Sequence, residues 1–207
     1  MPSKLSPEKQ AVFLENTLKP AIAKAKSGLI ELFFVDASHF VMGGVAGRLW
    51  GKVRLWVRTA AGRKRYNVLG ALNFISKKIE TITNDSYITS VQVVELMEKL
   101  SSAYIGKPIA IILDNAKYQR CALVIAKALE VKIELIFLPT YSPNLNLIER
   151  VWKFVKAEVL SAAYIETFEN YCSNISVFVD TIEIAHADKM SSLVTEKFQL
   201  FDKCKIT

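Results

Sequence analysis

The sequence of 207 residues predicts an α/β protein built on one mixed β-sheet of about five strands with helices on its faces. Two short apolar runs, 109–113 and 133–138, have the length and composition of buried strands, and the segment between them has helical spacing. An earlier apolar and aromatic run, 29–35, precedes two segments that are typical of paired strands. Consecutive strands followed by alternating strands and helices indicate a mixed sheet rather than an all-β or all-α fold.

The chain is expected to begin with a helix. Ser6 is a suitable N-cap and Pro7 fits the first helical position. Pro20 is expected to kink or restart this helix, and Ser27-Gly28 to end it. The central strand 29–35 follows and is expected to end at Asp36.

The middle of the chain predicts a hairpin and the second half predicts helices. Residues 66–74 and 78–83 are expected to pair, and 53–57 to form a further short strand. Helical spacing of apolar residues predicts helices over 89–104, 116–130, 148–159 and 164–182. Within 116–130 we expect Leu123, Ala126 and Leu129 to face the core, and residues 139–145 form a turn rich in Pro, Ser and Asn.

The composition is that of a globular protein with a basic surface. The chain is 51% hydrophobic, with a net charge of +7 and a pI near 9.2. A basic balance favours a polyanionic partner, because neutralised phosphates release counterions. The basic residues are concentrated between Arg48 and Arg65, where seven Arg or Lys occur and no acid.

Cysteine and histidine usage excludes several classes of site. Three widely spaced cysteines without a CxxC pair argue against a disulfide framework and against a zinc site, and two histidines exclude a His-rich metal site. The sequence shows no secretory segment, and no apolar run approaches the roughly 18–20 residues that span a bilayer. We therefore expect no membrane partner and a cytoplasmic, nucleoid-associated protein.

Three carboxylates stand where a metal site can form. Asp36 ends the run 29–35, Asp114 ends the run 109–113, and Glu149 lies at the start of a predicted helix. If the two strands are parallel neighbours, their carboxyl ends place both aspartates at one edge of the sheet, where ligands bind in open α/β sheets. Carboxylate oxygens are the ligands that Mg²⁺ prefers, and two such ions about 4 Å apart can activate an attacking oxygen and stabilise a leaving one.

Each acid also has a purely structural interpretation. Asp114 can form a turn or cap the next helix, and Asp36 can cap a turn with Ser38. Asn146 and Glu149 have the spacing of a capping box, in which the glutamate only satisfies a backbone amide. For each acid taken singly, the structural role explains its position at least as well as a metal site does. The occurrence of all three acids in such positions favours the metal site.

Three stretches carry a resemblance to a known family. They are Phe-Val-Asp-Ala-Ser-His-Phe at 34–40, Leu-Asp-Asn-Ala-Lys-Tyr-Gln-Arg at 113–120, and the stretch 138–152 with its string Tyr-Ser-Pro-Asn-Leu-Asn-Leu-Ile-Glu. These stretches resemble the three acidic motifs of DDE transposases, in the bacterial insertion-sequence branch of the Tc/mariner superfamily. Thirty-four residues separate Asp114 from Glu149, the separation expected of that branch.

The resemblance implies a ribonuclease H-like fold and metal-dependent DNA transposition. It implies two Mg²⁺ or Mn²⁺ ions, DNA cleavage at transposon ends, and strand transfer into a target without a covalent protein intermediate. Asp36, Asp114 and Glu149 match the motif acids and are expected to be catalytic and to bind the metal. The implied partner is DNA, both transposon ends and target, with a homodimer assembled on it.

Two departures from the family pattern stand out. Relatives often carry His at the position of Gln119, which can hydrogen-bond but cannot titrate. Family members normally begin with helix-turn-helix modules, whereas this sequence starts almost directly at the catalytic domain. Three explanations stay open: an upstream helix-turn-helix domain that is encoded separately, a degenerate copy of the gene, or a truncated chain.

Further residues are candidates for orienting the acids and for holding DNA. Asn115, Gln119 and Asn144 are expected to orient the acids, with turn chemistry as the alternative for the two asparagines. The candidate DNA contacts are Arg48, Lys52, Arg54, Arg63, Lys64, Arg65, Lys117, Arg120, Arg150, Lys153 and Lys156. The alternative for all of them is an ordinary solvated surface.

We expect an N-terminal helical lead-in at 1–28, a catalytic core at 29–160, and a C-terminal helical extension at 161–207 packed on the core. Two other functions stay open. One is a catalytically idle DNA-binding or assembly remnant, which the presence of all three acids disfavours. The other is a different ribonuclease H-like nuclease, which the Tyr-Ser-Pro-Asn string disfavours.

Overall fold

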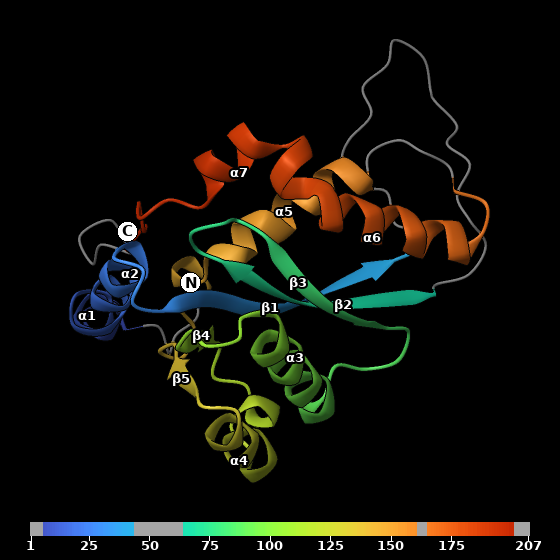
Figure 1. Ribbon diagram of the computed structural model, residues 1–207. Helices are drawn as coiled ribbons and strands as arrows, with labels where there is room; N and C mark the ends of the chain where they lie inside the picture. Colours follow the sequence, from blue (N-terminus) through green and yellow to red (C-terminus); the bar gives the residue numbers. More distant parts are fainter. Residues whose placement is uncertain (1–5, 44–63, 161–164, 201–207) are drawn as a thin grey trace.

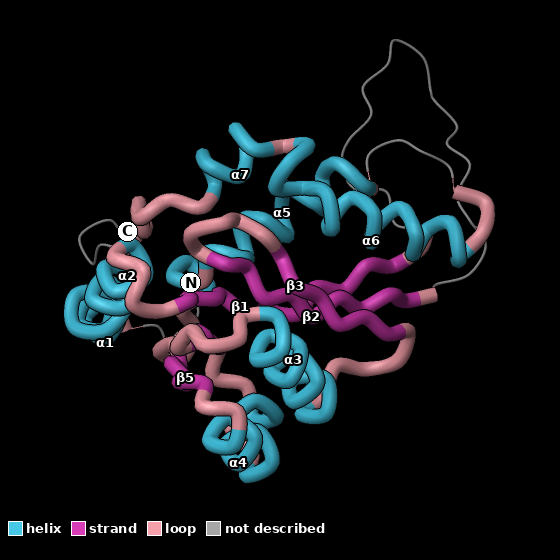
Figure 2. Tube along the Cα trace, in the orientation of Figure 1, coloured by secondary structure: helices cyan, strands magenta, loops and turns pink. Residues whose placement is uncertain are grey.

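The computed structural model describes residues 6–43, 64–160 and 165–200, which form one five-stranded sheet with helices on both faces (Figure 1, Figure 2). The strands are β1 (Glu31–Val41), β2 (Arg65–Asn73), β3 (Ile79–Asn84), β4 (Ile109–Leu113) and β5 (Ile133–Phe137), in the spatial order β3-β2-β1-β4-β5. The pairs β1–β2 and β2–β3 are antiparallel, whereas β1–β4 and β4–β5 are parallel. The predicted mixed sheet and the predicted hairpin are confirmed.

Strand β1 is longer than predicted. It continues through Asp36 to Val41, because β2 pairs with it along this whole length and places Gly70 opposite Asp36. On its other side β1 pairs with β4 only from Glu31 to Phe34. Asp36 therefore lies beyond the carboxyl end of β4, at the edge of the sheet where Asp114 also emerges.

Helices cover the two faces of the sheet as separate layers. They are α1 (Pro7–Phe13), α2 (Lys19–Lys26), α3 (Ser90–Ala103), α4 (Ala122–Glu130), α5 (Leu147–Val159), α6 (Phe168–Ala185) and α7 (Ala187–Leu193). In Figure 1, α3 and α4 lie below the sheet, and α5, α6 and α7 lie above it. Strand β1 contributes to both cores, because its side chains alternate: Phe34 packs with α2, α5 and α6, and Phe33 packs with α3 and α4.

The predicted N-terminal helix forms, with a local change before Pro20. The Ser6 side chain accepts a hydrogen bond from the backbone N–H of Lys9, as expected for an N-cap. A π-helical turn, Leu14–Leu18, separates α1 from α2. Proline has no N–H for the regular helical bond, so a wider turn just before it is a reasonable way to restart the helix. Gly28 follows α2 with a φ of 74°, the left-handed conformation that ends helices.

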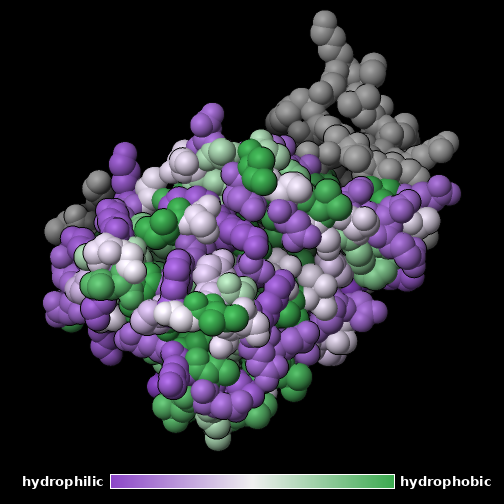
Figure 3. All heavy atoms as spheres, viewed as in Figure 1, coloured by the Kyte–Doolittle hydropathy of each residue, from purple (hydrophilic) through white to green (hydrophobic). Residues whose placement is uncertain are grey.

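The predicted helix 116–130 forms as two separate elements, and the second one packs on the core with a different face from the one we expected. A 3₁₀ turn, Lys117–Gln119, precedes α4. The expected inward positions Leu123 and Leu129 are 50% and 76% exposed, and Val124 is buried instead. Figure 3 shows apolar side chains at the lower surface, where Figure 1 places α4. The prediction failed because α4 is apolar on several sides, so its spacing does not identify the packed face.

Three remaining expectations have different outcomes. The predicted strand 53–57 lies outside the described residues. The C-terminal region is helical as expected, in α6 and α7, and its buried residues join the core around α5. The division of the chain at residues 28 and 160 stays a prediction. Among the described residues, no helix has the length and apolar character needed to cross a membrane.

Candidate active site

Asp36 occupies a half-buried position in β1. Burial, together with the negative charges of Glu149 and Asp114, raises the pKa of its carboxyl from an ordinary value of 3.8 to about 8. The backbone N–H of Ala37 and the ammonium group of Lys156 act in the opposite direction and are outweighed. The turn-capping alternative for Asp36 is wrong, because residues 31–41 form one continuous strand.

Asp114 follows the last residue of β4, as predicted. Burial raises the pKa of its carboxyl, and the backbone N–H of Ala116 and the side chain of Gln119 partly lower it. The contact with Ala116 is the turn-forming role that the sequence offered as an alternative. It does not exclude a chemical role, because the Asp114 side chain stays exposed to solvent and lines a pocket.

Glu149 lies in the first turn of α5. Burial raises the pKa of its carboxyl, Lys156 lowers it and Asp114 raises it. The capping-box alternative is wrong, because the N-cap residue Asn146 makes no side-chain cap. The Asn146 amide instead donates a buried hydrogen bond of 3.1 Å to the carbonyl of Val35, the residue before Asp36. The Glu149 carboxylate therefore has no capping role in this helix.

Helix α5 approaches the sheet closely beside Asp36. A Cβ atom placed on Gly70 would lie 2.5 Å from Cζ2 of Trp152, a distance that real side chains do not tolerate. Trp152 is one helical turn after Glu149, and Gly70 is the cross-strand partner of Asp36. The missing side chain at Gly70 lets α5 bring Glu149 to the strand that carries Asp36.

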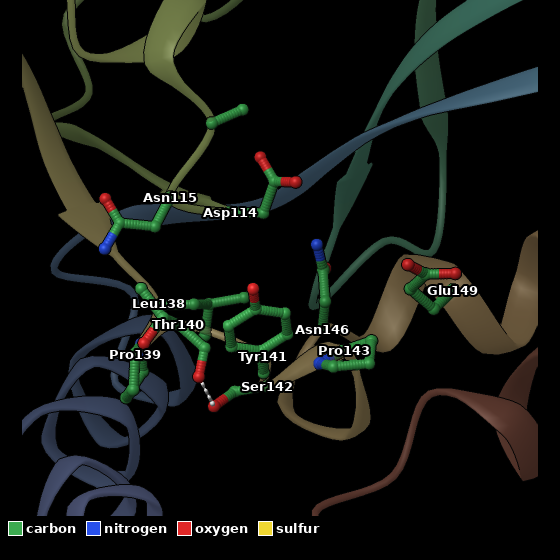
Figure 4. A pocket seen from close by; sticks show the side chains of 11 residues that line it. Asp114, Asn115, Leu138, Pro139, Thr140, Tyr141, Ser142, Pro143, Asn146 and Glu149 are labelled. Atoms are coloured by element: carbon green, nitrogen blue, oxygen red, sulfur yellow. Dashed lines mark hydrogen bonds between the residues drawn. The ribbon is translucent and has the colours of Figure 1, made fainter. Parts of the chain in front are cut away.

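A pocket of about 410 Å³ opens beside the acids. It is lined by Asp114, Asn115, Ala116, Leu138, Pro139, Thr140, Tyr141, Ser142, Pro143, Asn146 and Glu149. Figure 4 shows the carboxylates of Asp114 and Glu149 on different sides of this pocket, with Asn146 between them in this view. Asp36 is not one of the lining residues, and it is linked to the other two acids through the effect of their charges on its pKa.

The three residues expected to orient the acids have different surroundings. Gln119 is fully buried, and its side chain faces Asp114. Asn115 lines the pocket, and its Oδ1 accepts a hydrogen bond of 2.7 Å from Arg120. Asn144 bonds to Gln10 and to the carbonyl of Gln199 rather than to an acid.

The candidate DNA contacts fall into three groups. Arg48, Lys52, Arg54 and Arg63 lie outside the described residues. Lys64, Arg65, Lys117, Arg120 and Lys153 are exposed, as a DNA contact requires. Half-buried Lys156 lies close enough to Asp36 and Glu149 to affect their pKa values. The half-buried guanidinium of Arg150 donates to the carbonyls of Leu193, Thr195 and Lys197, which gives it a structural role.

Two residues of the site were not proposed from the sequence. Tyr118 lies near Asp114 and Asp36, and burial followed by these two charges raises the pKa of its hydroxyl to about 12. Asn146 lines the pocket, and its Oδ1 is buried without a hydrogen-bond partner. Asn146 could have been noticed from its Asn-x-x-Glu spacing with Glu149, but the same spacing also fits a helix cap.

The donors suit a hard divalent cation. The three carboxylates supply oxygen ligands from three elements, and each is destabilised in its charged form by burial. Within the described ranges, no three His, Cys, Asp or Glu side chains form a group that could hold a metal ion. Mg²⁺ is commonly bound by one or two carboxylates with waters and substrate phosphate, so the residues fit an ion that is bound together with substrate.

Comparison with known proteins identifies a family and a fold. The sequence profile described as "DDE superfamily endonuclease" matches residues 31–172. A search of curated proteins found no match. The crystal structure of the catalytic domain of Mos1 mariner transposase matches with a TM-score of 0.52 and 14% identity, covering 98% of this chain and 100% of that one.

Two larger Mos1 structures match as well. The Mos1 strand transfer complex gives a TM-score of 0.57 at 13% identity, and the paired end complex with Mn gives 0.60 at 12% identity. Each match covers 98% of this chain, but this chain spans only 65% and 66% of the length of the two Mos1 chains. At such identities the matches show the fold, and the predicted ribonuclease H-like architecture is confirmed. The assignment to the bacterial insertion-sequence branch stays a prediction.

Proposed function

This chain belongs to the DDE superfamily of endonucleases, and from that premise we propose that it is the catalytic domain of a transposase. The proposed reaction is divalent-metal-dependent cleavage of DNA at transposon ends, followed by strand transfer into target DNA. The observation that carries the proposal is that Asp114 and Glu149 line one pocket, and that their charges, together with burial, raise the pKa of the Asp36 carboxyl. Carboxylates that repel one another at one sheet edge are suited to binding cations.

We assign the cation-binding role to Asp36, Asp114 and Glu149. Bound Mg²⁺ or Mn²⁺, two ions in the full site, would stabilise charge on the attacking and leaving oxygens of a phosphodiester. Crystal structures of the Mos1 paired end complex with Mn and with Mg support this choice of cation. Buried Gln119 and pocket-lining Asn115 would keep Asp114 and the first turn after β4 in place.

We propose that DNA lies across the pocket and the exposed basic residues around it. Exposed Lys117 and Arg120 follow Asp114 within six residues, and exposed Lys153 lies on α5 with Glu149, so they can contact phosphates near the cleaved bond. Two transposon ends must be joined to one target, so we propose a homodimer on DNA. A separately encoded helix-turn-helix domain and association with the nucleoid stay predictions.

The test is metal-dependent nicking and strand transfer with the purified chain. Supercoiled plasmid and labelled duplex are incubated with Mg²⁺, with Mn²⁺ or with a chelator. We expect activity only with metal, and loss of activity in Asp36→Ala, Asp114→Ala and Glu149→Ala. The matched control is Glu134→Ala, which removes an exposed carboxylate near the start of β5 and is expected to keep full activity.

Other outcomes would support the other functions. Nuclease activity that survives all three substitutions would rule out the assigned acids. Salt-dependent DNA binding without metal binding by calorimetry would instead favour a catalytically idle DNA-binding remnant. Preference for RNA–DNA hybrids in a competition assay would favour a different ribonuclease H-like nuclease.

A further inference from the structure

A buried glutamine of the N-terminal helix reaches the loop that leads to Glu149. Gln10 of α1 is 1% exposed. Its Nε2 lies 3.0 Å from Ser142 Oγ, 3.3 Å from the carbonyl oxygen of Tyr141 and 3.3 Å from Asn144 Oδ1. Its Oε1 accepts a hydrogen bond of 3.1 Å from Asn144 Nδ2. Two side-chain amides thus bond to each other in both directions, across more than 130 positions of sequence.

The first three residues of the loop 139–146, which are Pro139, Thr140 and Tyr141, have no backbone–backbone hydrogen bonds to hold them within the part of the chain that the structure describes. Tyr141 has a φ of 59°, a left-handed conformation that is unfavourable for a residue with a side chain. Such conformations persist only where the surroundings hold them, and the Gln10 amide supplies a bond to the carbonyl of this residue.

This loop joins the pocket to the helix that carries Glu149. Tyr141, Ser142 and Pro143 line the pocket, and Asn146 at the end of the loop is the N-cap of α5. Asn144 also donates a hydrogen bond of 2.7 Å to the carbonyl of Gln199, so the loop is held from the C-terminal side as well. A change in the loop would therefore move the pocket wall and the first turn of α5 together.

We propose that Gln10 is a positioning residue, which holds the loop 139–146 in the conformation that presents the pocket wall and Glu149 for catalysis. The catalytic part of this inference rests on the proposed function, whereas the structural part does not. A buried amide is required at this position because it must donate to oxygens of the loop and accept from Asn144 at the same time. Neither an aliphatic side chain nor a carboxylate can do both.

The structural test uses Gln10→Met and Asn144→Leu, which preserve approximate side-chain size and remove the polar atoms. Hydrogen exchange is followed at the amides of Leu145 and Asn146, which bond to the carbonyls of Ser142 and Pro143 within the loop. We expect exchange at both amides to accelerate about tenfold in either variant, since a lost side-chain bond leaves buried partners unsatisfied. In the double variant the acceleration should be smaller than the product of the two single effects, because the two amides form one unit.

The matched control is Leu14→Ala, which removes a buried apolar side chain one helical turn after Gln10 and leaves the amides of Gln10 and Asn144 in place. It should lower the melting temperature. The exchange rates at Leu145 and Asn146, relative to those of the amides in the sheet, should stay as in the wild type. Unchanged exchange in Gln10→Met, independent effects in the double variant, or an equal effect from Leu14→Ala would each overturn the proposal.

The catalytic test compares kcat with KM for DNA. We expect kcat of Gln10→Met to fall about tenfold with little change in KM, because the side chain positions Glu149 and does not contact substrate. If Gln10→Met has a normal kcat although exchange at Leu145 and Asn146 is accelerated, the contact between Gln10 and the loop has no catalytic role. If the wild-type chain has no activity in any condition, the proposed function fails, and the exchange measurements still decide whether Gln10 holds the loop.

Discussion

Replacing Asp36 with asparagine is expected to stabilise the metal-free protein at alkaline pH. The pKa of this carboxyl is about 8 in the folded chain, against an ordinary value of 3.8. Between these values the folded state keeps a proton that the unfolded state has lost. The free energy of unfolding contributed by Asp36 therefore falls as pH rises from about 4 to about 8. Asparagine carries no charge in either state and avoids this loss.

The size of the effect follows from the shift. One pKa unit corresponds to about 1.4 kcal/mol, so the difference between 3.8 and about 8 sets a ceiling of about 6 kcal/mol. Asp36 is half-buried and some water reaches it, so we expect Asp36→Asn to gain about 2 to 3 kcal/mol at pH 9 in chelator. Saturating Mg²⁺ should reverse the order of the two proteins, because an ion bound by the native state stabilises the wild type more.

Urea unfolding at about pH 5 and about pH 9, with chelator or Mg²⁺, measures these differences. The control is Asp85→Asn, the same chemical change at an exposed position in the loop after β3, which should change little at either pH. The reasoning is refuted if Asp36→Asn is no more stable than the wild type at high pH without metal. It is also refuted if the gain does not depend on pH.

Four further substitutions test how α5 is held and which of its basic residues contacts DNA. Gly70→Ala should destabilise the chain by about 1 to 3 kcal/mol and lower the nicking rate, because the new methyl group collides with Trp152; unchanged unfolding would contradict the close approach. Asn146→Leu should cost about 1 to 3 kcal/mol by leaving the buried Val35 carbonyl unsatisfied, and equal stability in urea would show that this bond contributes nothing. Arg150→Met should lower the melting temperature, because the guanidinium holds three backbone carbonyls. Lys153→Met should instead reduce the salt slope of DNA binding by about one. If Arg150→Met reduces the salt slope and Lys153→Met lowers the melting temperature, Arg150 is the DNA contact.

The sheet was predictable because its strands carry local signals. The runs 109–113 and 133–138 are short, apolar and followed by turn residues, and they form β4 and β5 almost as predicted. The end of β1 was not predictable in the same way. Asp36 looks like the end of an apolar run, and only the pairing with β2 shows that the strand continues to Val41.

The site was predictable where a single stretch of sequence contains both the acid and the strand end or helix start that positions it. This is so for Asp114 and Glu149, and both line the pocket. The supporting contacts were not predictable, because their partners are distant in sequence. Nothing near Gln10 indicates that it bonds to Asn144, and an asparagine before a helix looks the same whether it caps the helix or bonds to a strand.

Two of the contacts that hold α5 lie beside Asp36. Asn146 bonds to Val35, which precedes Asp36 along β1, and Trp152 packs on Gly70, which faces Asp36 across the β1–β2 pair. The bond from Asn146 fixes where α5 begins along β1, and the contact of Trp152 with Gly70 fixes the distance between the helix and the sheet. Together they position the third acid relative to the first, whereas Asp114 depends on the parallel pairing of β4 with β1. Substitutions at Gly70 or Asn146 should therefore disturb the relation of Glu149 to Asp36 while leaving Asp114 in place.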